Sequence, residues 1–278
     1  MSNLSDIKRR LSSVKQTRQI TGAMETVSVA KMRKAIEQCE NCSAYKDAVS
    51  DIMYAVLDSA SDYEPKNGRD ALIILSSDKG LCGAFDHDLF RFVGQIDGNT
   101  TLFPIGQACI DYYKDKPNVD FRFGKRYIST YKNASDIAAE LLTLYGNGIK
   151  SISIAYSKLS GSRTEAVVER LLPLKKDGKQ KRSVPSIVEP SVNVVYKTLL
   201  PLYFADLIYC AILNNVAAEH SARHAAMSAA TESADKLIYQ LTMDYNRVRQ
   251  SSVTEQITEI IGATSAMVDI GAVDSEKS

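Results

Sequence analysis

The sequence predicts a mixed α/β protein in which two long terminal helices form an antiparallel pair and carry an inserted α/β domain. Residues 1–64 lack proline and contain one glycine, and residues 202–278 lack proline and contain two. Because proline breaks a helix interior and glycine weakens it, each stretch is typical of a long helix. Short apolar runs alternate with amphipathic stretches between them, which indicates a sheet covered by helices. We expect three parts: residues 1–64, 65–198 and 199–278.

Composition narrows the class of protein. The 278 residues are 45% apolar and 24% charged, as in ordinary soluble domains, and the net charge of +1 predicts no strong attraction to nucleic acid. We expect no transmembrane helix and no signal peptide, and hence a reducing compartment. The first 40 residues are rich in lysine and arginine, which suits an acidic partner. The cysteines are odd in number and scattered, which argues against a disulfide framework: Cys39, Cys42, Cys82, Cys109 and Cys210.

Both terminal helices show apolar seams. The N-terminal seam begins with Leu4, Ile7, Leu11 and Val14. It is then expected to shift register at Arg18 and Thr21, where Ile20, Met24 and Val27 take over, and a shifted seam predicts an irregular coiled coil. A helix over residues 3–58 spans roughly 80 Å, so one end is expected to project from the body. The C-terminal seam steps by four and three residues through Val253, Ile257, Ile260, Thr264 and Met267.

The middle of the chain predicts a series of short elements. The expected strands are residues 71–77, 101–105, 118–123, 150–156 and 165–172. The last of these also fits a helix by pattern, but its β-branched pair and the following Pro173 favour a strand. The expected helices are residues 86–96, 107–116 and 134–145, the first with Leu89, Phe92, Val93 and Ile96 on one face. Residues 173–201 read as a surface link into the second long helix.

The loop SSDKGLCGAF, residues 76–85, is the first candidate site because it joins a strand to a helix, where phosphate-binding loops sit. It matches neither GxGxxG nor GxxxxGK[ST], so a tight turn is favoured, with a protein-contact loop as the other alternative. Cys82 in this loop lacks the neighbours of a catalytic nucleophile and reads as a structural thiol.

Other clusters carry weaker signals. Cys39 and Cys42 form a C-x-x-C spacing within a helix, but no second cysteine pair completes a zinc site. His220 and His224, with Glu219, share a helix face and could bind a metal, although a solvated or interhelical pair is favoured. We therefore expect no metal, no cofactor and no catalytic residues.

A polar segment follows on the last helix. Residues 246–260, NRVRQSSVTEQITEI, combine Arg249, Gln250 and Thr254 with the apolar seam. Arginine suits bidentate pairing with carboxylates, so this is either a partner-contact patch or a solvated face.

Taken together, these segments resemble a known family. Residues 7–35 (IKRRLSSVKQTRQITGAMETVSVAKMRKA) and 220–263 resemble the N- and C-terminal signatures of the gamma subunit of F-type ATP synthases. SSDKGLCGAF resembles that family's central-domain loop, and residues 199–215 (LLPLYFADLIYCAILNN) resemble its foot region. The likeness runs in order over essentially the whole chain.

The resemblance implies a rotor. It implies a terminal coiled coil forming a central stalk, and an inserted domain of Rossmann-like shape that holds no nucleotide. The implied partners are the alpha and beta subunits of the catalytic head, the epsilon subunit and the membrane c-ring. Nucleic acid and a small-molecule substrate of its own are not implied, and the implied location is peripheral, on the cytoplasmic face of a bacterial inner membrane.

The resemblance also assigns roles to single residues. Arg249, Gln250 and Thr254 fall where the family's last helix meets a beta subunit. Lys79, Cys82 and Met24 are implied to face beta subunits lower on the stalk, and Tyr203 to lie near the epsilon and c-ring contacts. Gly22 departs from the family, which often has lysine there. The competing readings are a nucleotide-dependent enzyme and a generic coiled-coil scaffold.

Overall fold

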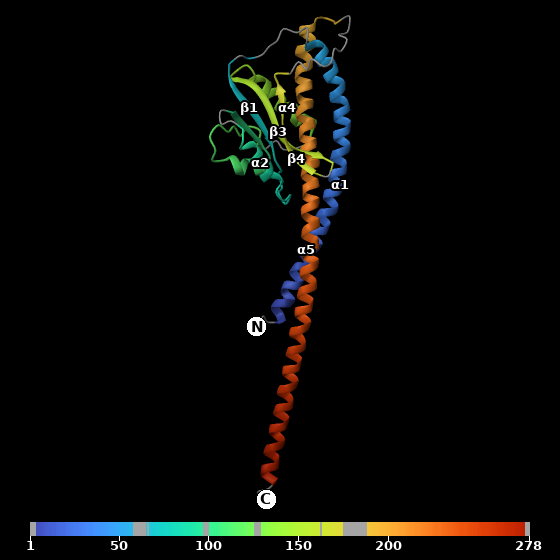
Figure 1. Ribbon diagram of the computed structural model, residues 1–278, viewed down its shortest axis with the longest axis vertical. Coiled ribbons are helices and arrows are strands. Elements are labelled where there is room, and N and C mark those ends of the chain that lie inside the picture. The colour runs from blue at the N-terminus through green and yellow to red at the C-terminus, as the bar shows by residue number, and fades with distance from the viewer. Residues whose placement is uncertain are drawn as a thin grey trace. The chain divides into compact units, whose positions relative to one another are not determined.

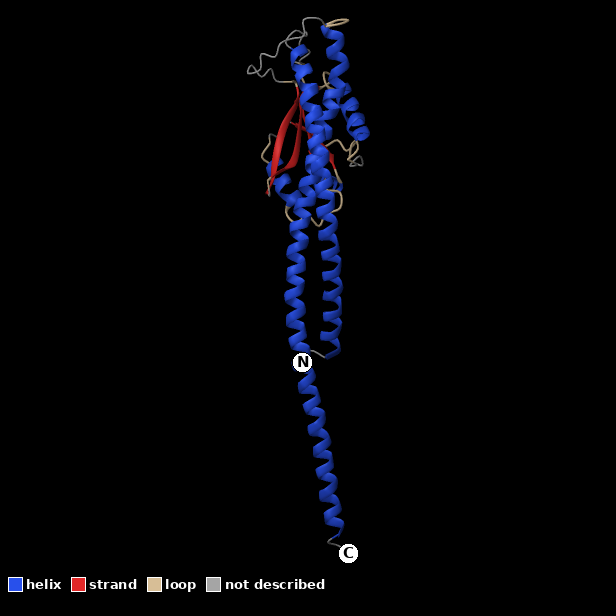
Figure 2. Ribbon diagram, turned by 90° about the vertical axis from the view of Figure 1, so that its right-hand side faces the viewer, coloured by secondary structure: helices blue, strands red, loops and turns tan. Residues whose placement is uncertain are grey.

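The computed structural model describes residues 4–57, 65, 67–96, 100–124, 129–161, 163–174 and 188–275, with side chains described up to Thr264. These residues divide into two compact units. One unit is the single stretch of residues 25–226, and the other combines residues 1–24 with residues 227–278. Figure 1 labels most of the helices and strands, and Figure 2 colours the chain by secondary structure.

Two long helices account for the two ends of the chain. Helix α1 covers Leu4–Leu57 and helix α5 covers Val192–Ser275, so both predicted terminal helices are confirmed. Helix α5 begins before the predicted position, because Pro201 lies inside the helix rather than ending a surface link. Of the predicted link over residues 173–201, residues 175–187 lie outside the described residues, and residues 192–201 are helical.

One part of helix α5 bears on the expectation that the chain has no transmembrane helix. It contains a stretch long and apolar enough to cross a membrane by length and composition, and 56% of that stretch is buried inside the structure. Phe204, Ile208 and Ile212 from this region belong to the core beneath the sheet. Their packing gives a reason for the apolar composition that does not involve a lipid bilayer.

The larger unit is built on a four-stranded sheet. The order is β2-β1-β3-β4, with β1 (Arg69–Leu75), β2 (Thr100–Ile105), β3 (Ile149–Ser160) and β4 (Arg163–Leu172). Strand β1 is parallel to both β2 and β3, whereas β3 and β4 are antiparallel. The apolar run at residues 71–75 alternates between the two faces, and all five residues are buried. A run buried on both faces is typical of a central parallel strand.

Helices cover both faces of this sheet. On one face, Leu72 and Ile74 pack with α2 (Phe85–Val93) and α3 (Gln107–Tyr113). On the other, Ile73 packs with α4 (Tyr131–Leu144) and with the first part of α5. The predicted α/β arrangement is thus confirmed, and it includes β4 as a strand.

Two predicted details of the inserted domain are wrong. Residues 118–123 form no regular strand, because only Val119 makes an isolated bridge to Leu102 and the chain then turns. In α2, Phe90 is buried while Phe92 is partly exposed. Tyr112 of α3 stacks on the Phe90 ring, and Tyr113 meets that ring edge-on, so Phe90 packs against α3.

The seam of α1 does not shift register, contrary to prediction. Buried residues continue at seven-residue spacing from Ile7 through half-buried Val14 to Thr21, Ser28, Ala35, Cys42, Val49 and Val56. Of the three expected replacements, Ile20 and Val27 are more than half exposed and Met24 is half-buried. The hydroxyl of Thr231 donates to that of Thr21 at 2.8 Å, so a polar residue keeps its place in the seam. A strict heptad favours a left-handed supercoil.

The cysteine prediction is also wrong in one respect. Cys42 of α1 and Cys210 of α5 form a disulfide, with Cα atoms 6.0 Å apart, while Cys39, Cys82 and Cys109 are free. The spacing of the cysteines does not predict this disulfide, because 168 residues separate Cys42 from Cys210. The pairing of α1 with α5 brings the two residues together.

Candidate functional site

The loop after β1 has an unusual backbone. Gly80, Leu81 and Gly83 all have φ between 57° and 64°, in the left-handed region. Glycine adopts this region at little cost, but leucine is strained there. Leu81 is nevertheless 61% exposed, so its side chain does not obtain compensating burial within this chain. A strained, exposed apolar residue at a loop tip is typical of a contact point for another molecule.

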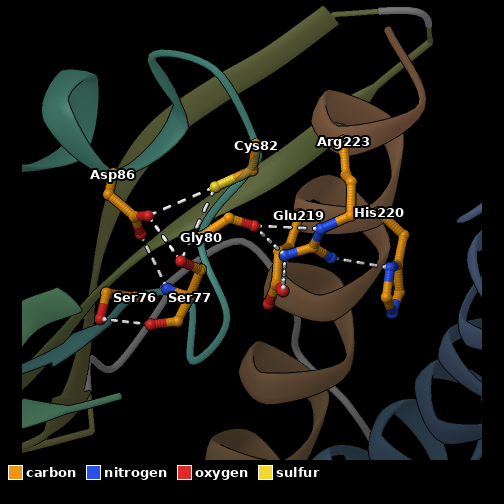
Figure 3. A network of polar contacts seen from close by, with 8 residues as sticks. All are labelled: Ser76, Ser77, Gly80, Cys82, Asp86, Glu219, His220 and Arg223. Atoms are coloured by element: carbon orange, nitrogen blue, oxygen red, sulfur yellow. Dashed lines mark hydrogen bonds and ion pairs between the residues drawn. The ribbon is translucent and has the colours of Figure 1, made fainter. Parts of the chain in front are cut away.

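A carboxylate holds the base of this loop. The Asp86 carboxylate accepts hydrogen bonds from the Ser77 backbone N–H at 2.7 Å and from the Ser77 hydroxyl at 2.6 Å. The Cys82 thiol donates to the same carboxylate at 3.4 Å (Figure 3). Burial, with the nearby Asp86 charge, raises the pKa of Cys82 to about 11. The thiol therefore stays protonated near neutral pH and is a poor nucleophile.

The same carboxylate disfavours a phosphate site. Asp86 and Asp88 both lie in the first turn of α2, so the positive end of the helix dipole already faces negative charge. A phosphate at this position would meet the Asp86 carboxylate, which already holds the Ser77 N–H and hydroxyl. The geometry therefore supports the tight-turn and protein-contact alternatives for residues 76–85 over nucleotide binding.

An arginine on α5 anchors the tip of the loop. The Arg223 guanidinium donates to the Gly80 carbonyl oxygen at 2.8 and 3.2 Å and to the Glu219 carboxylate at 2.7 Å (Figure 3). Arg223 is 6% exposed and Glu219 is 5% exposed. A buried pair with further hydrogen bonds fixes geometry because neither charge can move without losing its partner. The sequence prediction missed Arg223, although its i,i+4 spacing from Glu219 was a visible signal.

His220 belongs to the same network. A guanidinium nitrogen of Arg223 lies 3.1 Å from His220 Nδ1, and because arginine is always a donor the imidazole nitrogen accepts. Burial, together with the charges of Arg223, Lys31 and Lys79, lowers the pKa of His220 to about 4. His220 is therefore neutral at pH 7 and uses one ring nitrogen for Arg223.

The histidine pair shows no metal-binding geometry in the described residues. His224 lies 3.6 Å from the Glu25 carboxylate, while His220 faces Arg223. Within the ranges given above, no group of three or more His, Cys, Asp or Glu side chains could hold a metal ion. The arrangement is that of an interhelical and helix–loop contact.

The second candidate region lies on the last part of α5. Arg249, Gln250 and Thr254 are exposed, and the Thr254 hydroxyl donates to the Gln250 carbonyl oxygen one turn earlier, at 2.9 Å. Val253 and Ile257 are both about half exposed on the same stretch. Apolar residues at helical spacing that face solvent need a partner outside this chain.

The pairing of α1 with α5 in the smaller unit explains where the exposed part of α5 begins. Arg18 of α1 pairs with Asp235 of α5 at 3.0 Å, and Thr21 bonds Thr231, so the two segments run antiparallel. Arg10 and Asp244 line a shared groove nearer the start of α1. Helix α1 is described from Leu4, about two turns before Arg10. The pairing of its described residues with α5 therefore ends within about two turns after Asp244.

The remaining predicted residues have different surroundings. Lys79 is exposed on the loop, and Met24 is half-buried on α1. Tyr203 is only 4% exposed, because it packs with Val49 and Met53 in the core of the larger unit. Its neighbour Leu202 is 45% exposed, so Leu202 rather than Tyr203 offers apolar surface in this region.

Comparison with known proteins decides the family. A family model described as ATP synthase matches residues 3–267. The ATP synthase gamma chain of Fusobacterium nucleatum is 34% identical, and the alignment covers 96% of this chain and all of the relative. This chain belongs to the ATP synthase gamma chain family. The gamma chain of Heliobacterium modesticaldum, 31% identical over 96% of this chain and all of its own length, agrees with that assignment.

The gamma chain fold is also found among solved structures. A chain from the rotor of the Euglena gracilis mitochondrial ATP synthase has a TM-score of 0.67 and 15% identity, covering 90% of this chain and 98% of that one. At this identity the likeness concerns the fold.

Proposed function

We propose that this member of the ATP synthase gamma chain family is the central-stalk rotor of its complex. It couples rotation of the membrane c-ring, driven by ion flow, to the conformational cycle of the catalytic beta subunits. ATP is made or hydrolysed on the beta subunits, and this chain is a non-catalytic subunit. The single observation that carries the proposal is the exposed apolar and polar face of α5 beyond its pairing with α1.

This face suits a shaft that turns inside a ring of subunits. Val253, Ile257 and Ile260 are each about half to two-thirds exposed, although apolar side chains normally seek burial. A shaft with one apolar face and other polar faces contacts each surrounding subunit differently. Each orientation then stabilises a different subunit conformation through its differential contact energy.

Specific contacts are proposed at both candidate regions. Arg249, Gln250 and Thr254 contact a beta subunit near the tip of the shaft, and exposed Arg249 suits a bidentate carboxylate partner. The loop carrying Lys79 and Cys82 contacts beta subunits lower down. Because Cys82 is buried, Lys79 and Leu81 provide the contacting side chains, and Cys82 holds the loop in shape.

The remaining assignments follow the same scheme. Residues 1–64 and 199–278 form the shaft, and residues 65–198 form the inserted domain. Met24 lies on the lower shaft, facing a beta subunit, and the region of Tyr203 docks on the epsilon subunit and the c-ring. The chain is a peripheral protein on the cytoplasmic face of a bacterial inner membrane, with no cofactor and no small-molecule substrate of its own.

Reconstitution tests the proposal. The full chain, combined with alpha and beta subunits, is expected to restore rotary ATPase activity, which a generic coiled-coil scaffold would not do. Titrating the isolated chain with labelled ATP addresses the enzyme alternative, which tight stoichiometric binding would favour.

The Arg249→Ala variant tests the contact near the tip. In the complete complex, we expect it to lower coupled ATP synthesis several-fold, because an exposed side chain is removed from an interface without loss of core packing. Circular dichroism of the isolated subunit should be unchanged. Arg163→Ala, at an exposed position on β4, is the matched control. Equal synthesis rates for both variants would argue against a contact at Arg249.

A further inference from the structure

We propose that a cleft between α1, α5 and the sheet of the larger unit binds a small zwitterion, an α-amino acid with an aliphatic side chain, which joins α1 to strands β3 and β4. This inference goes beyond rotor function and does not depend on it. The cleft has a volume of about 250 Å³. Because a water molecule occupies about 30 Å³ of the liquid, this volume holds roughly eight waters or a ligand with a similar number of non-hydrogen atoms.

The walls of the cleft come from four elements. Helix α1 contributes Glu40 and Lys46, β3 contributes Lys158, and β4 contributes Glu169. Helix α5 contributes the apolar Leu207. The described residues that line the cleft thus include two lysines and two glutamates, whose formal charges sum to zero.

Two oxygen acceptors in the cleft belong to side chains that hydrogen bonds hold in place. The Tyr156 hydroxyl, on a side chain that is 2% exposed, donates to Glu169 Oε1 at 2.7 Å. The Asn214 side-chain amide donates to the Cys210 carbonyl oxygen at 2.8 Å. Glu169 Oε2 and Asn214 Oδ1 accept no hydrogen bond from any residue that the structure describes. Both oxygens therefore stay available to an ammonium group, which has three donors.

The two lysines supply the opposite charge. Neither Lys46 nor Lys158 forms an ion pair with another residue in the part of the chain that the structure describes, although two glutamates line the same cleft. A ligand carboxylate bound by both lysines gains charge-assisted hydrogen bonds. A simple anion would be repelled by the glutamates and a simple cation by the lysines, whereas a zwitterion complements both signs.

The apolar part of the ligand has a separate wall. Leu207 and Ala211 lie one turn apart on α5, and both line the cleft. Placing an aliphatic side chain against them removes apolar surface from water, which favours binding. Leucine, with about nine non-hydrogen atoms, fits the volume and supplies an ammonium, a carboxylate and such a side chain.

The cysteines of the cleft favour binding of the ligand without its chemical transformation. Cys39 lines the cleft, but burial and the neighbouring Glu40 raise the pKa of Cys39 to about 11. Cys39 is therefore a protonated thiol at neutral pH and a poor nucleophile. Cys210 is held in its disulfide with Cys42. A binding site of this kind is compatible with a non-catalytic subunit.

Ligand binding to the full chain is the direct test. Saturation-transfer NMR titrations use L-leucine and two analogues that each lack one charged group: 4-methylpentanoate lacks the ammonium, and 3-methylbutylamine lacks the carboxylate. We expect leucine to bind and each analogue to bind at least about tenfold more weakly, because its charge-assisted hydrogen bonds at one end are lost. Absence of leucine binding, or equal affinity for leucine and either analogue, would overturn the proposal.

Substitutions in the cleft locate the ligand. Lys158→Gln removes a positive charge that meets the ligand carboxylate, and Glu169→Gln removes a negative charge that meets the ammonium while keeping an oxygen for the Tyr156 hydroxyl. Each should weaken leucine binding by about tenfold or more. Lys114→Gln, at an exposed position at the end of α3 and outside the cleft, is the matched control and should bind leucine as the parent does. The same leucine affinity in all three variants would contradict a site in this cleft.

Hydrogen exchange shows whether the ligand joins α1 to the sheet. Leucine at about ten times its Kd should slow exchange of amides in residues 39–46 and 156–158, because a ligand that binds only the folded chain suppresses local opening. The same concentration should raise the Tm of the parent by about 2–5 °C and that of Lys158→Gln by less. Unchanged exchange on α1 would contradict a ligand that spans the two elements. If a variant does not fold, the two leucine analogues still decide the question on the parent chain.

Discussion

At the scale of single residues, buried charge fixes the best-defined part of the candidate site. Arg223, Glu219 and the Gly80 carbonyl oxygen form a network whose charged members are almost fully buried. Such a pair costs desolvation free energy when it forms, so it contributes more to geometry than to net stability. Its role is to hold the loop against α5 and thereby to present Lys79 and Leu81.

Removing one partner of this pair should be costly. We expect Arg223→Ala to lower the free energy of unfolding by about 3–5 kcal/mol, because the Glu219 carboxylate would remain buried without the guanidinium charge. Denaturant titration of the isolated chain measures the change. Lys236→Ala is the matched control, since Lys236 forms an i,i+4 pair with Glu232 on the same helix that is about 70% exposed. An exposed pair of this kind contributes little to stability because solvent screens its charges, and similar losses in both variants would contradict the role of burial.

His220 predicts a dependence of stability on pH. Its folded-state pKa of about 4 lies below the ordinary value of 6.5, so between these values the unfolded chain binds more protons than the folded chain. The contribution of His220 to stability is therefore present at pH 7 and declines as the pH falls from about 6.5 to about 4. Unfolding titrations across this range should show a shallower decline for His220→Gln. The same slope in parent and variant would rule out His220 as the cause.

At the scale of elements, glycines set the two sharp turns that frame the sheet. Gly106, after β2, and Gly148, before β3, both have φ of +105°. A Cβ at Gly106 would lie 2.6 Å from Ser76 Oγ and 2.8 Å from the Ser76 carbonyl oxygen, whereas a Cβ at Gly148 would meet no atom within 4 Å. Ser76 Oγ also accepts from the Cys109 backbone N–H, so this close approach connects β1 to α3.

Alanine substitutions at these two glycines distinguish the cost of backbone strain from the cost of steric overlap. Both Gly106→Ala and Gly148→Ala should lose about 1–3 kcal/mol of unfolding free energy from backbone strain. Gly106→Ala should lose about 1–3 kcal/mol more, because Ser76 must move. Equilibrium denaturation of the two variants side by side gives the difference. Equal losses would mean that the region of Ser76 accommodates the methyl group.

At the scale of the whole molecule, α5 changes its surroundings along its length. Residues 203–218 are largely buried in the larger unit, whereas nearly every described residue from 249 to 264 is exposed. Helix stability in proteins comes mainly from packing, so these two ends of one helix should differ in local stability. The exposed end is the one for which we propose partners.

Hydrogen exchange should detect this gradient in the isolated chain. Amides at residues 205–218 should exchange at least about a thousandfold more slowly than amides at residues 250–262, because their opening requires disruption of the core. In the assembled complex, protection of the second segment should rise as partners cover it. Uniform protection along α5 in the isolated chain would contradict a helix end that depends on partners.

Local sequence features predicted the main elements of the fold and the resemblance to the family. The absence of proline and the scarcity of glycine in residues 1–64 and 202–278 predicted both terminal helices. The apolar run at residues 71–77 predicted the central strand, because local propensity and periodicity decide these elements. Likewise, the loop at residues 76–85 and the patch at residues 246–260 stood out from residue types alone.

Burial, pairing and hydrogen bonding between residues far apart in the sequence are seen only in the folded chain. Thr21 stays in the seam because Thr231 supplies a hydrogen bond, and Tyr203 is buried because Val49 and Met53 of α1 pack against it. Cys42 meets Cys210 across 168 residues, and Arg223 meets Gly80 across 143. Periodicity assigns a residue to a face of its own helix, but burial, pairing and pKa arise from the groups that the fold brings against that face.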